Sequence, residues 1–496
     1  MKMESSLWKK NKLMNPHKLF IFLLFVVSTV AKGQSPVDSS KLYLGLDQVL
    51  IIVKKTHPII QQANLQQDFA DAEVLIAKGQ LDPKIQASYD RKQLQGEEYW
   101  DVFNSSLKIP TWFPVDPKIE VKRAQGTQVD GEDYISSSTN YWQVSTGISL
   151  PLGQGLFIDE RRALIKQSRY FGNLAEAEQN KQVNKLLLTV IKSYWEWYYA
   201  YEQFKLIEQS ITIAEELYRR TKLDYTYGEV AAIDTIQAKI TLQSRLVEYE
   251  TAKLQLLQNR LGLSVHLWNE NAFPLELQEN VFPTDVYSFG ITPTDSSLSK
   301  LQNWALENHP EITKLKAKIG QQEIEQRWAS EQLKPTMNLS YSSIDAPITS
   351  DADFKALEWQ DNYKLGLDFA FPIFLRKERG KLQKSKLYVE TLEYSILQTR
   401  QEINAEIRAT FASLKTNQIL SNQYQAMANN YQLLLNAVIF DLENGESDLF
   451  KLNIQQDKFI ESQLKALKAK TNFEKMKATL PQVIGLPELS YEKVYE

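Results

Sequence analysis

The sequence predicts an α+β membrane protein in which two tandem repeats each join short β-strands to a very long helical hairpin. Two spans, residues 152–273 and 373–480, contain no proline and carry apolar residues at helical spacing. A His-Pro break recurs at one offset (309 − 57 = 252), and so does a proline before an alternating segment (335 − 83 = 252). An offset shared by two motifs indicates an internal duplication.

The composition of the 496-residue chain is that of a folded protein, with 43% hydrophobic and 24% charged residues. The formal net charge of −4 lacks the basic excess that a nucleic-acid partner requires, so we expect none. The absence of cysteine excludes disulfides, thiolate metal sites and cysteine nucleophiles. The four histidines lie far apart and no cofactor motif is present, so we expect no metal, no cofactor and no catalytic residues, and hence no enzyme.

The N-terminus has the pattern of a secretory signal peptide. An apolar run, Leu19–Ala31, is preceded by Lys9, Lys10, Lys12 and Lys18. The run is too short to span a membrane as a helix but suits the core of a signal peptide, which we place at residues 1–33. A buried core helix is the less favoured alternative, because the basic flank comes first and a polar segment follows. We therefore expect the mature protein to leave the cytoplasm.

The first repeat is expected to cover residues 34–268. It begins with a helical segment that is broken at Pro58. Strands follow at about 84–92 and 140–150, where apolar and polar residues alternate with period two. The repeat ends in a long helical hairpin.

This first hairpin is predicted at residues 156–262. Gly228 interrupts its apolar pattern, so we place the turn between the two helices there. A helix rising 1.5 Å per residue over the first arm would reach roughly 100 Å, which no compact globule accommodates. The apolar seam of the returning arm consists of Ile233, Ile236, Ile240, Val247, Leu254, Leu257 and Leu261.

The second repeat is expected to cover residues 298–486. Its strands are predicted at about 336–343 and 362–371, by the same alternation. Its long helical hairpin is predicted at 374–480 and contains a late glycine, Gly445. The two repeats therefore share the order helix, strand, loop, strand, long hairpin.

Three further segments are predicted to be irregular. The stretch at about 93–139 is rich in glycine and proline and is interpreted as a long loop between the first two strands. Residues 269–297 contain three prolines and are interpreted as a linker between the repeats. Residues 487–496 form a tail that is too short for a domain.

Each of the four predicted strands is about as long as a transmembrane β-strand. A soluble sheet with one wet face gives the same alternation, so the strands alone leave both interpretations open. The predicted export of the chain and its very long helices favour the interpretation as transmembrane strands. Four strands cannot close a barrel without leaving backbone groups unpaired in lipid, so several chains must share one, and three copies would give 12 strands.

The sequence resembles the TolC family of outer-membrane efflux channels over essentially the whole mature chain. The resemblance rests on the duplicated order of elements and on the strand-to-helix junctions at Pro151 and Pro372. It also rests on the segment from Gly228 to Ala238, which is similar to the family's Gly-x5-Asp-x3-Ala pattern at a periplasmic hairpin tip. Asp234 is the acidic residue of that pattern.

The resemblance implies a homotrimer in the outer membrane of a Gram-negative bacterium. A 12-stranded β-barrel in the lipid would continue into a long α-helical barrel that projects through the periplasm. The tapered end would open when docked to a periplasmic adaptor (membrane fusion) protein and an inner-membrane transporter. Such a duct exports small molecules or secreted proteins and performs no chemistry itself.

Four residues are candidates for the periplasmic tip and gate, namely Gly228, Asp234, Gly445 and Asp448. The aspartates of three chains could form an acidic ring that attracts cations. Ordinary solvated helix carboxylates are the favoured interpretation of the same two residues. Asp448 follows its glycine by three residues rather than six, so it fits the family pattern less well than Asp234 does.

Two other functions compete with an export duct. A soluble periplasmic coiled-coil scaffold or adaptor protein would use the same long helices and needs no lipid-facing strands. A secreted enzyme has no nucleophile, metal cluster or cofactor motif to support it. A heat-modifiable trimer in outer-membrane fractions would favour the duct, whereas a soluble species would favour the scaffold.

Overall fold

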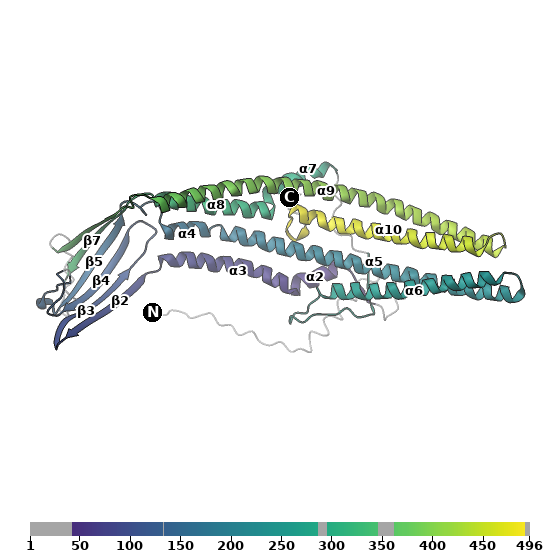
Figure 1. Cartoon of the computed structure of the whole chain (residues 1–496), viewed down its shortest axis with the longest axis horizontal. Coiled ribbons are helices and arrows are strands. Elements are labelled where there is room, and N and C mark those ends of the chain that lie inside the picture. Colours follow the sequence, from purple (N-terminus) through teal and green to yellow (C-terminus); the bar gives the residue numbers. More distant parts are fainter. Residues whose placement is uncertain (1–41, 132, 286–294, 346–361, 492–496) are drawn as a thin grey trace, which may run out of the picture.

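The computed structural model describes residues 42–131, 133–285, 295–345 and 362–491 of the chain. The predicted signal peptide lies outside these residues. The molecule is a long rod with a β-sheet at one end and helices running from it along the full length (Figure 1). Within the described residues, no helix is apolar over a length that would cross a bilayer.

Six strands form one antiparallel sheet at the end of the rod (Figure 1). Their order in the sheet is β2-β3-β4-β5-β7-β8, and the two edge strands have no second strand partner among the described residues. The strands are β2 (Lys84–Leu94), β3 (Glu97–Lys108), β4 (Asp116–Gln125), β5 (Trp142–Pro151), β7 (Thr336–Asp345) and β8 (Tyr363–Ala370).

The prediction of four strands is wrong, because the segment interpreted as a loop at 93–139 contains β3 and β4. Gln95 and Gly96 have φ of 53° and 86° and form the two-residue turn that joins β2 to β3. Pro110, Pro114, Pro117 and Gly126 lie within two residues of a strand end, and Gly131 lies in the connection between β4 and β5. Their density reflects tight turns in a hairpin rather than one long loop.

Two long helical hairpins extend away from the sheet. The first consists of α5 (Phe171–Tyr227) and α6 (Ala232–Ser264), and the second of α9 (Arg376–Glu443) and α10 (Leu449–Ile484). The 68 residues of α9 correspond to about 100 Å of helix. Both hairpin turns lie at the end of the rod that is opposite the sheet (Figure 1).

Two shorter helices, α3 (Pro58–Lys78) and α8 (Pro310–Glu331), lie between the sheet and the middle of the rod (Figure 1). Each begins with proline, whose missing N–H costs no hydrogen bond at that position. A histidine caps each one: Nδ1 of His57 accepts from the Ile59 N–H at 3.1 Å, and Nδ1 of His309 accepts from the Glu311 N–H at 3.2 Å. The His-Pro pairs seen in the sequence are therefore helix starts.

The middle of the rod holds the main core, built on aromatic residues of α5. Tyr194, Trp195 and Trp197 are at most 1% exposed. The Tyr194 hydroxyl accepts from the Thr284 N–H at 3.0 Å and lies 3.0 Å from the Leu44 carbonyl oxygen. It thereby anchors a short parallel pair of strands, β1 (Leu42–Leu44) with β6 (Val281–Pro283). The helix that follows β1, α2 (Leu46–Thr56), packs against α5.

At both ends of the rod the helices lie side by side, with α5 in the second place and α9 at one side. Near the sheet, α3, α5, α8 and α9 contact one another in that order, and towards the far end the order is α6, α5, α10 and α9. The sheet runs from β2, which follows α3, to β8, which precedes α9. The protomer therefore has two lateral edges, which we call the α6 edge (α3, α6 and β2) and the α9 edge (α9 and β8).

Candidate functional site

The turn between α5 and α6 holds two of the predicted tip residues. Gly228 ends α5 with a φ of 82°, a left-handed conformation that glycine adopts without strain. Asp234 stands in the first turn of α6, where its carboxylate accepts a hydrogen bond from the Ala231 N–H at 3.0 Å. The carboxylate thus satisfies a backbone donor that the helix leaves unpaired.

The turn between α9 and α10 repeats this arrangement with a shifted acid. Gly445 has a φ of 74°, and Asp448 is the N-cap of α10, accepting from the Lys451 N–H at 2.7 Å. Asp448 occupies the cap position itself, whereas Asp234 lies three residues into its helix. This shift accounts for the different Gly-to-Asp spacings in the two turns.

All four predicted tip residues therefore lie in the two turns at the far end of the rod (Figure 1). The structure gives both aspartates a role as helix caps. Across the ranges that the structure describes, no three acidic or histidine side chains cluster in a way that would bind a metal ion.

An ion pair joins the two hairpins above their turns. Arg245 of α6 is only 5% exposed, and its guanidinium donates to the carboxylate of Asp457 on α10. The same guanidinium lies 2.8 Å from Oε2 of Glu248. Burial disfavours the charge, but these carboxylates outweigh it and raise the pKa of Arg245. The sequence did not indicate this pair, although a lone arginine within an apolar helical pattern is a usable signal.

Apolar packing reinforces the same junction. Leu217 of α5 is buried against Leu435 and Val438 of α9 and Leu452 of α10. The two hairpins are therefore held together by a small apolar cluster and by the Arg245–Asp457 pair.

The predicted apolar seam of α6 is exposed in the protomer. Its seven residues are between 39% and 69% exposed, with Val247 and Ile233 at the upper limit. By contrast, Val190 and Ile207 of α5 are buried. A continuous apolar row along a helix indicates a face that packs against another element. Among the residues that the structure describes, no element of this chain covers the α6 edge.

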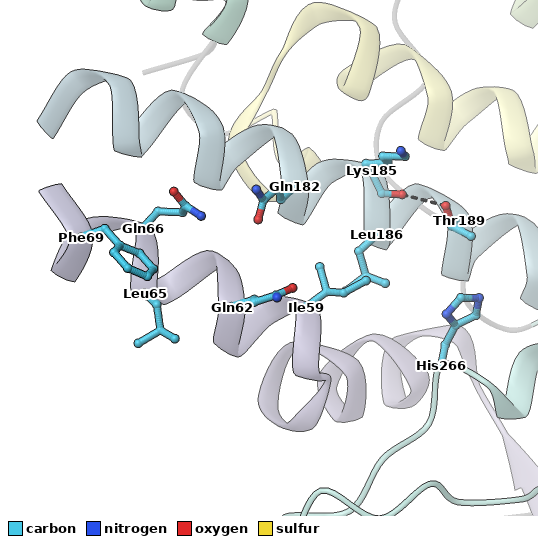
Figure 2. Close-up of a pocket in the computed structure, with 10 residues that line it drawn as sticks. All are labelled: Ile59, Gln62, Leu65, Gln66, Phe69, Gln182, Lys185, Leu186, Thr189 and His266. Carbon is cyan, nitrogen blue, oxygen red and sulfur yellow. Dashed lines mark hydrogen bonds between the residues drawn. The ribbon is translucent and has the colours of Figure 1, made fainter. Parts of the chain in front are cut away.

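A groove of about 500 Å³ lies on the same edge, between α3 and α5 (Figure 2). Apolar side chains of α3 line it, including Leu65 and Phe69, which are 49% and 65% exposed. His266 closes one end, with its ring centroid 6.0 Å from that of His57. Burial lowers the pKa of both imidazoles. The remaining lining residues are Ile59, Gln62, Gln66, Gln182, Lys185, Leu186 and Thr189.

The sheet has one apolar and one polar face. Residues directly opposite each other on neighbouring strands share a face, so the register of the strands assigns every position to one face. The mainly apolar rows are Ile85–Leu107–Ile119–Thr146, Tyr89–Phe103–Arg123–Trp142, Ala87–Ser105–Val121–Val144–Asp345, Ile148–Tyr341–Leu365 and Leu150–Leu339–Leu367. The polar rows include Ser88–Asn104–Lys122–Gln143, Ser106–Glu120–Ser145 and Ser149–Ser340. Transmembrane strands divide in this way between lipid and water.

Comparisons with known proteins agree with this geometry. Residues 52–267 match the family model of outer membrane efflux proteins. The fold is similar to that of the Campylobacter jejuni CmeC outer membrane channel, with a TM-score of 0.62, 16% identity, and coverage of 97% of this chain and 94% of that chain. None of the curated proteins matches the chain in sequence.

Two further solved structures share the fold. The open state of the Neisseria gonorrhoeae MtrE outer membrane channel gives a TM-score of 0.63 at 16% identity, covering 92% of this chain and 95% of that chain. The Vibrio cholerae outer membrane protein VceC gives 0.61 at 13% identity, covering 89% and 96%. At such identities the structures show the fold alone.

Proposed function

We propose that this chain is an outer membrane efflux protein, the family whose model matches residues 52–267, and that three copies of it assemble side by side into one export duct. In the proposed duct the sheets close a barrel in the lipid and the helical hairpins extend through the periplasm. A periplasmic adaptor and an inner-membrane transporter would complete the path for small molecules or secreted proteins.

The exposed seam of α6 is the observation that carries this proposal. In a ring of copies, the α6 edge of one protomer meets the α9 edge of the next, and the seam is covered. The α9 edge is also apolar and exposed. Its large exposed side chains are Leu387, Tyr388, Tyr394, Leu397, Ile419, Leu433, Leu434 and Phe440.

Ring closure also fits the lateral order of the elements. Each level contributes four helices, so three copies give a ring of 12 helices (4 × 3 = 12). The edge strand β2 belongs to the α6 edge and β8 to the α9 edge. On each side, a single neighbouring copy therefore covers both the edge strand of the sheet and the exposed helix surface.

The gate in this proposal is the far end of the hairpins, with the turns at Gly228, Asp234, Gly445 and Asp448. The Arg245–Asp457 pair lies close to these turns and holds one hairpin to the other. Opening would require the hairpins to separate there. Docking of the adaptor at the two turns is the event that we expect to drive the separation.

Disulfide trapping tests the ring, because the chain has no cysteine of its own. Ile240→Cys with Leu434→Cys, and Leu254→Cys with Ile419→Cys, pair positions at similar distances from their hairpin turns. We expect covalent trimers on non-reducing gels from outer-membrane fractions. As a control, Lys253→Cys lies off the seam and should not cross-link with Ile419→Cys. Failure of every seam pair, or covalent species larger than a trimer, would refute the ring of three.

A further inference from the structure

We propose that β3 and β4 are part of the membrane wall, so that three copies form an 18-stranded barrel (6 × 3 = 18) rather than a 12-stranded one. This inference rests on the proposed trimer. It specifies the number of strands in the barrel, and therefore how wide the barrel is.

Continuity of the sheet is the first argument. β3 is paired with β2 along its whole length, and β4 bridges β3 to β5. The sheet order thus places the hairpin between β2 and β5 rather than outside them. The two strands contain 12 and 10 residues, and a transmembrane β-strand needs about 9–11.

The second argument is that the hairpin continues both faces of the sheet. Phe103 and Val121 lie on the apolar face, and the Phe103 ring is 6.1 Å from Trp142 of β5. Arg123 lies in the row between these two rings, with its guanidinium 5.9 Å from the Trp142 ring. Asn104 and Lys122 lie on the polar face, in the row that continues to Gln143. A flap outside the wall would not need to keep lipid-facing and water-facing positions in register with β5.

The third argument is that the hairpin reaches the helical end of the sheet and is fixed there. The turn between β3 and β4 is closed by Asp116, whose carboxylate accepts from the Thr111 N–H at 3.2 Å. The same carboxylate lies 3.1 Å from Nη1 of Arg161, in the first turn of α4 (Glu160–Ser168). Both side chains are mostly buried, at 13% and 22% exposure. The hairpin therefore spans the full height of the wall.

The edges of the sheet allow closure with six strands per copy. All five pairings are antiparallel, so β2 and β8 run in opposite directions. Joining β8 of one copy to β2 of the next is then also antiparallel. Without that joint, both edges would leave backbone groups unpaired in lipid.

The wider barrel also fits the helical ring beneath it. Eighteen strands about 4.8 Å apart and tilted by about 40° give a circumference of roughly 110 Å, or a diameter of roughly 36 Å. Twelve strands would give a diameter of roughly 24 Å. Twelve helices packed about 9 Å apart also make a ring of roughly 110 Å. The duct would then leave the helical section without narrowing.

Cysteine labelling in native outer membranes tests the wall on matched positions. Val121→Cys of β4 lies opposite Val144→Cys of β5, and Lys122→Cys lies opposite Gln143→Cys. With a charged maleimide added from outside, we expect labelling at 122 and 143, and labelling at least about tenfold slower at 121 and 144, because the reagent must enter lipid. Where Val121→Cys impairs assembly, β3 offers the same comparison. Ser105→Cys lies opposite Val121 on the apolar face, and Asn104→Cys lies opposite Lys122 on the polar face.

The outcomes separate this inference from the proposed function. If β5 alternates but β3 and β4 label equally on both faces, the hairpin lies outside the wall. The 18-stranded barrel is then wrong, whereas the trimeric duct survives. If β5 fails to alternate as well, the sheet does not line a membrane pore and both proposals fall.

Discussion

At the scale of single residues, His309 makes one helix start sensitive to acid. Its Nδ1 accepts the capping hydrogen bond from the Glu311 N–H, and burial lowers its pKa to about 4 from an ordinary value of 6.5. The positive charge of Lys181 lowers this pKa further, while Glu311 opposes the shift. On acidification, the unfolded chain therefore takes up this proton before the folded protein does.

Protonation of His309 therefore destabilises the folded protein. His309 contributes its full stability above pH 6.5, and the contribution falls as the pH drops from 6.5 to about 4, by up to about 3 kcal/mol. His309→Asn keeps an N-cap acceptor and cannot titrate. We expect the variant to lose less stability than the wild type between pH 7 and pH 4.5, measured by circular dichroism in denaturant. Equal losses in both proteins would contradict the assignment.

Gly485 shows a close approach that only glycine allows. It ends α10 with a φ of 83°, and a Cβ there would lie 2.6 Å from Cδ of Pro310 and 2.7 Å from Cδ2 of His309. Gly228 has nearly the same φ, 82°, but open space around it. Comparing alanine at the two positions separates the cost of a left-handed backbone, which both share, from the steric cost, which only position 485 has.

We therefore expect Gly228→Ala to destabilise the protein by about 1–2 kcal/mol and Gly485→Ala by clearly more. Thermal unfolding of the two variants in detergent measures the difference. If both variants lost the same stability, the end of α10 would not be packed against the start of α8 as the structure has it.

At the scale of elements, the joint between α6 and α10 is where the hairpins are held together. Asp457→Asn removes the acceptor charge for Arg245, whereas Glu248→Gln alters a partner on α6 itself and leaves the contact between hairpins in place. A partly exposed ion pair is worth about 1 kcal/mol, or about fivefold in a closed-to-open ratio. In planar bilayers we expect higher open probability for Asp457→Asn, with little change for Glu248→Gln. A larger increase for Glu248→Gln than for Asp457→Asn would show that the Arg245–Asp457 pair does not hold the gate closed.

The long hairpins could be predicted from the sequence because local signals specify them. Prolines are absent from the spans, apolar residues keep helical spacing, and Gly228 lies at the turn. The hairpin of β3 and β4 was not predicted, because its turn glycines and prolines dominate a short stretch and mimic a loop. The exposed seam of α6 was visible in the sequence, but which surface covers it was not.

The candidate site was predictable only in part, for a related reason. Glycine and aspartate at a helix boundary are local signals, so Gly228 and Asp234 could be found from sequence, although their capping geometry came from the structure. Arg245 and Asp457 lie far apart in the chain. Their contact depends on how α6 packs against α10, which no local pattern records.

At the scale of the whole molecule, the protomer is incomplete at both lateral edges. The α6 edge and the α9 edge each combine exposed apolar helix surface with an edge strand. Edge strands and apolar seams both favour association. Because the same two edges recur at every level of the rod, one rotation between copies satisfies the sheet and the helices at once.

The central claim is that three copies close this ring. Native mass spectrometry of the complex extracted from outer membranes in detergent measures the number of copies directly. We predict one species with three times the mass of the processed chain, which persists on dilution. A monomer, a dimer or a ring of four or more copies would contradict the claim.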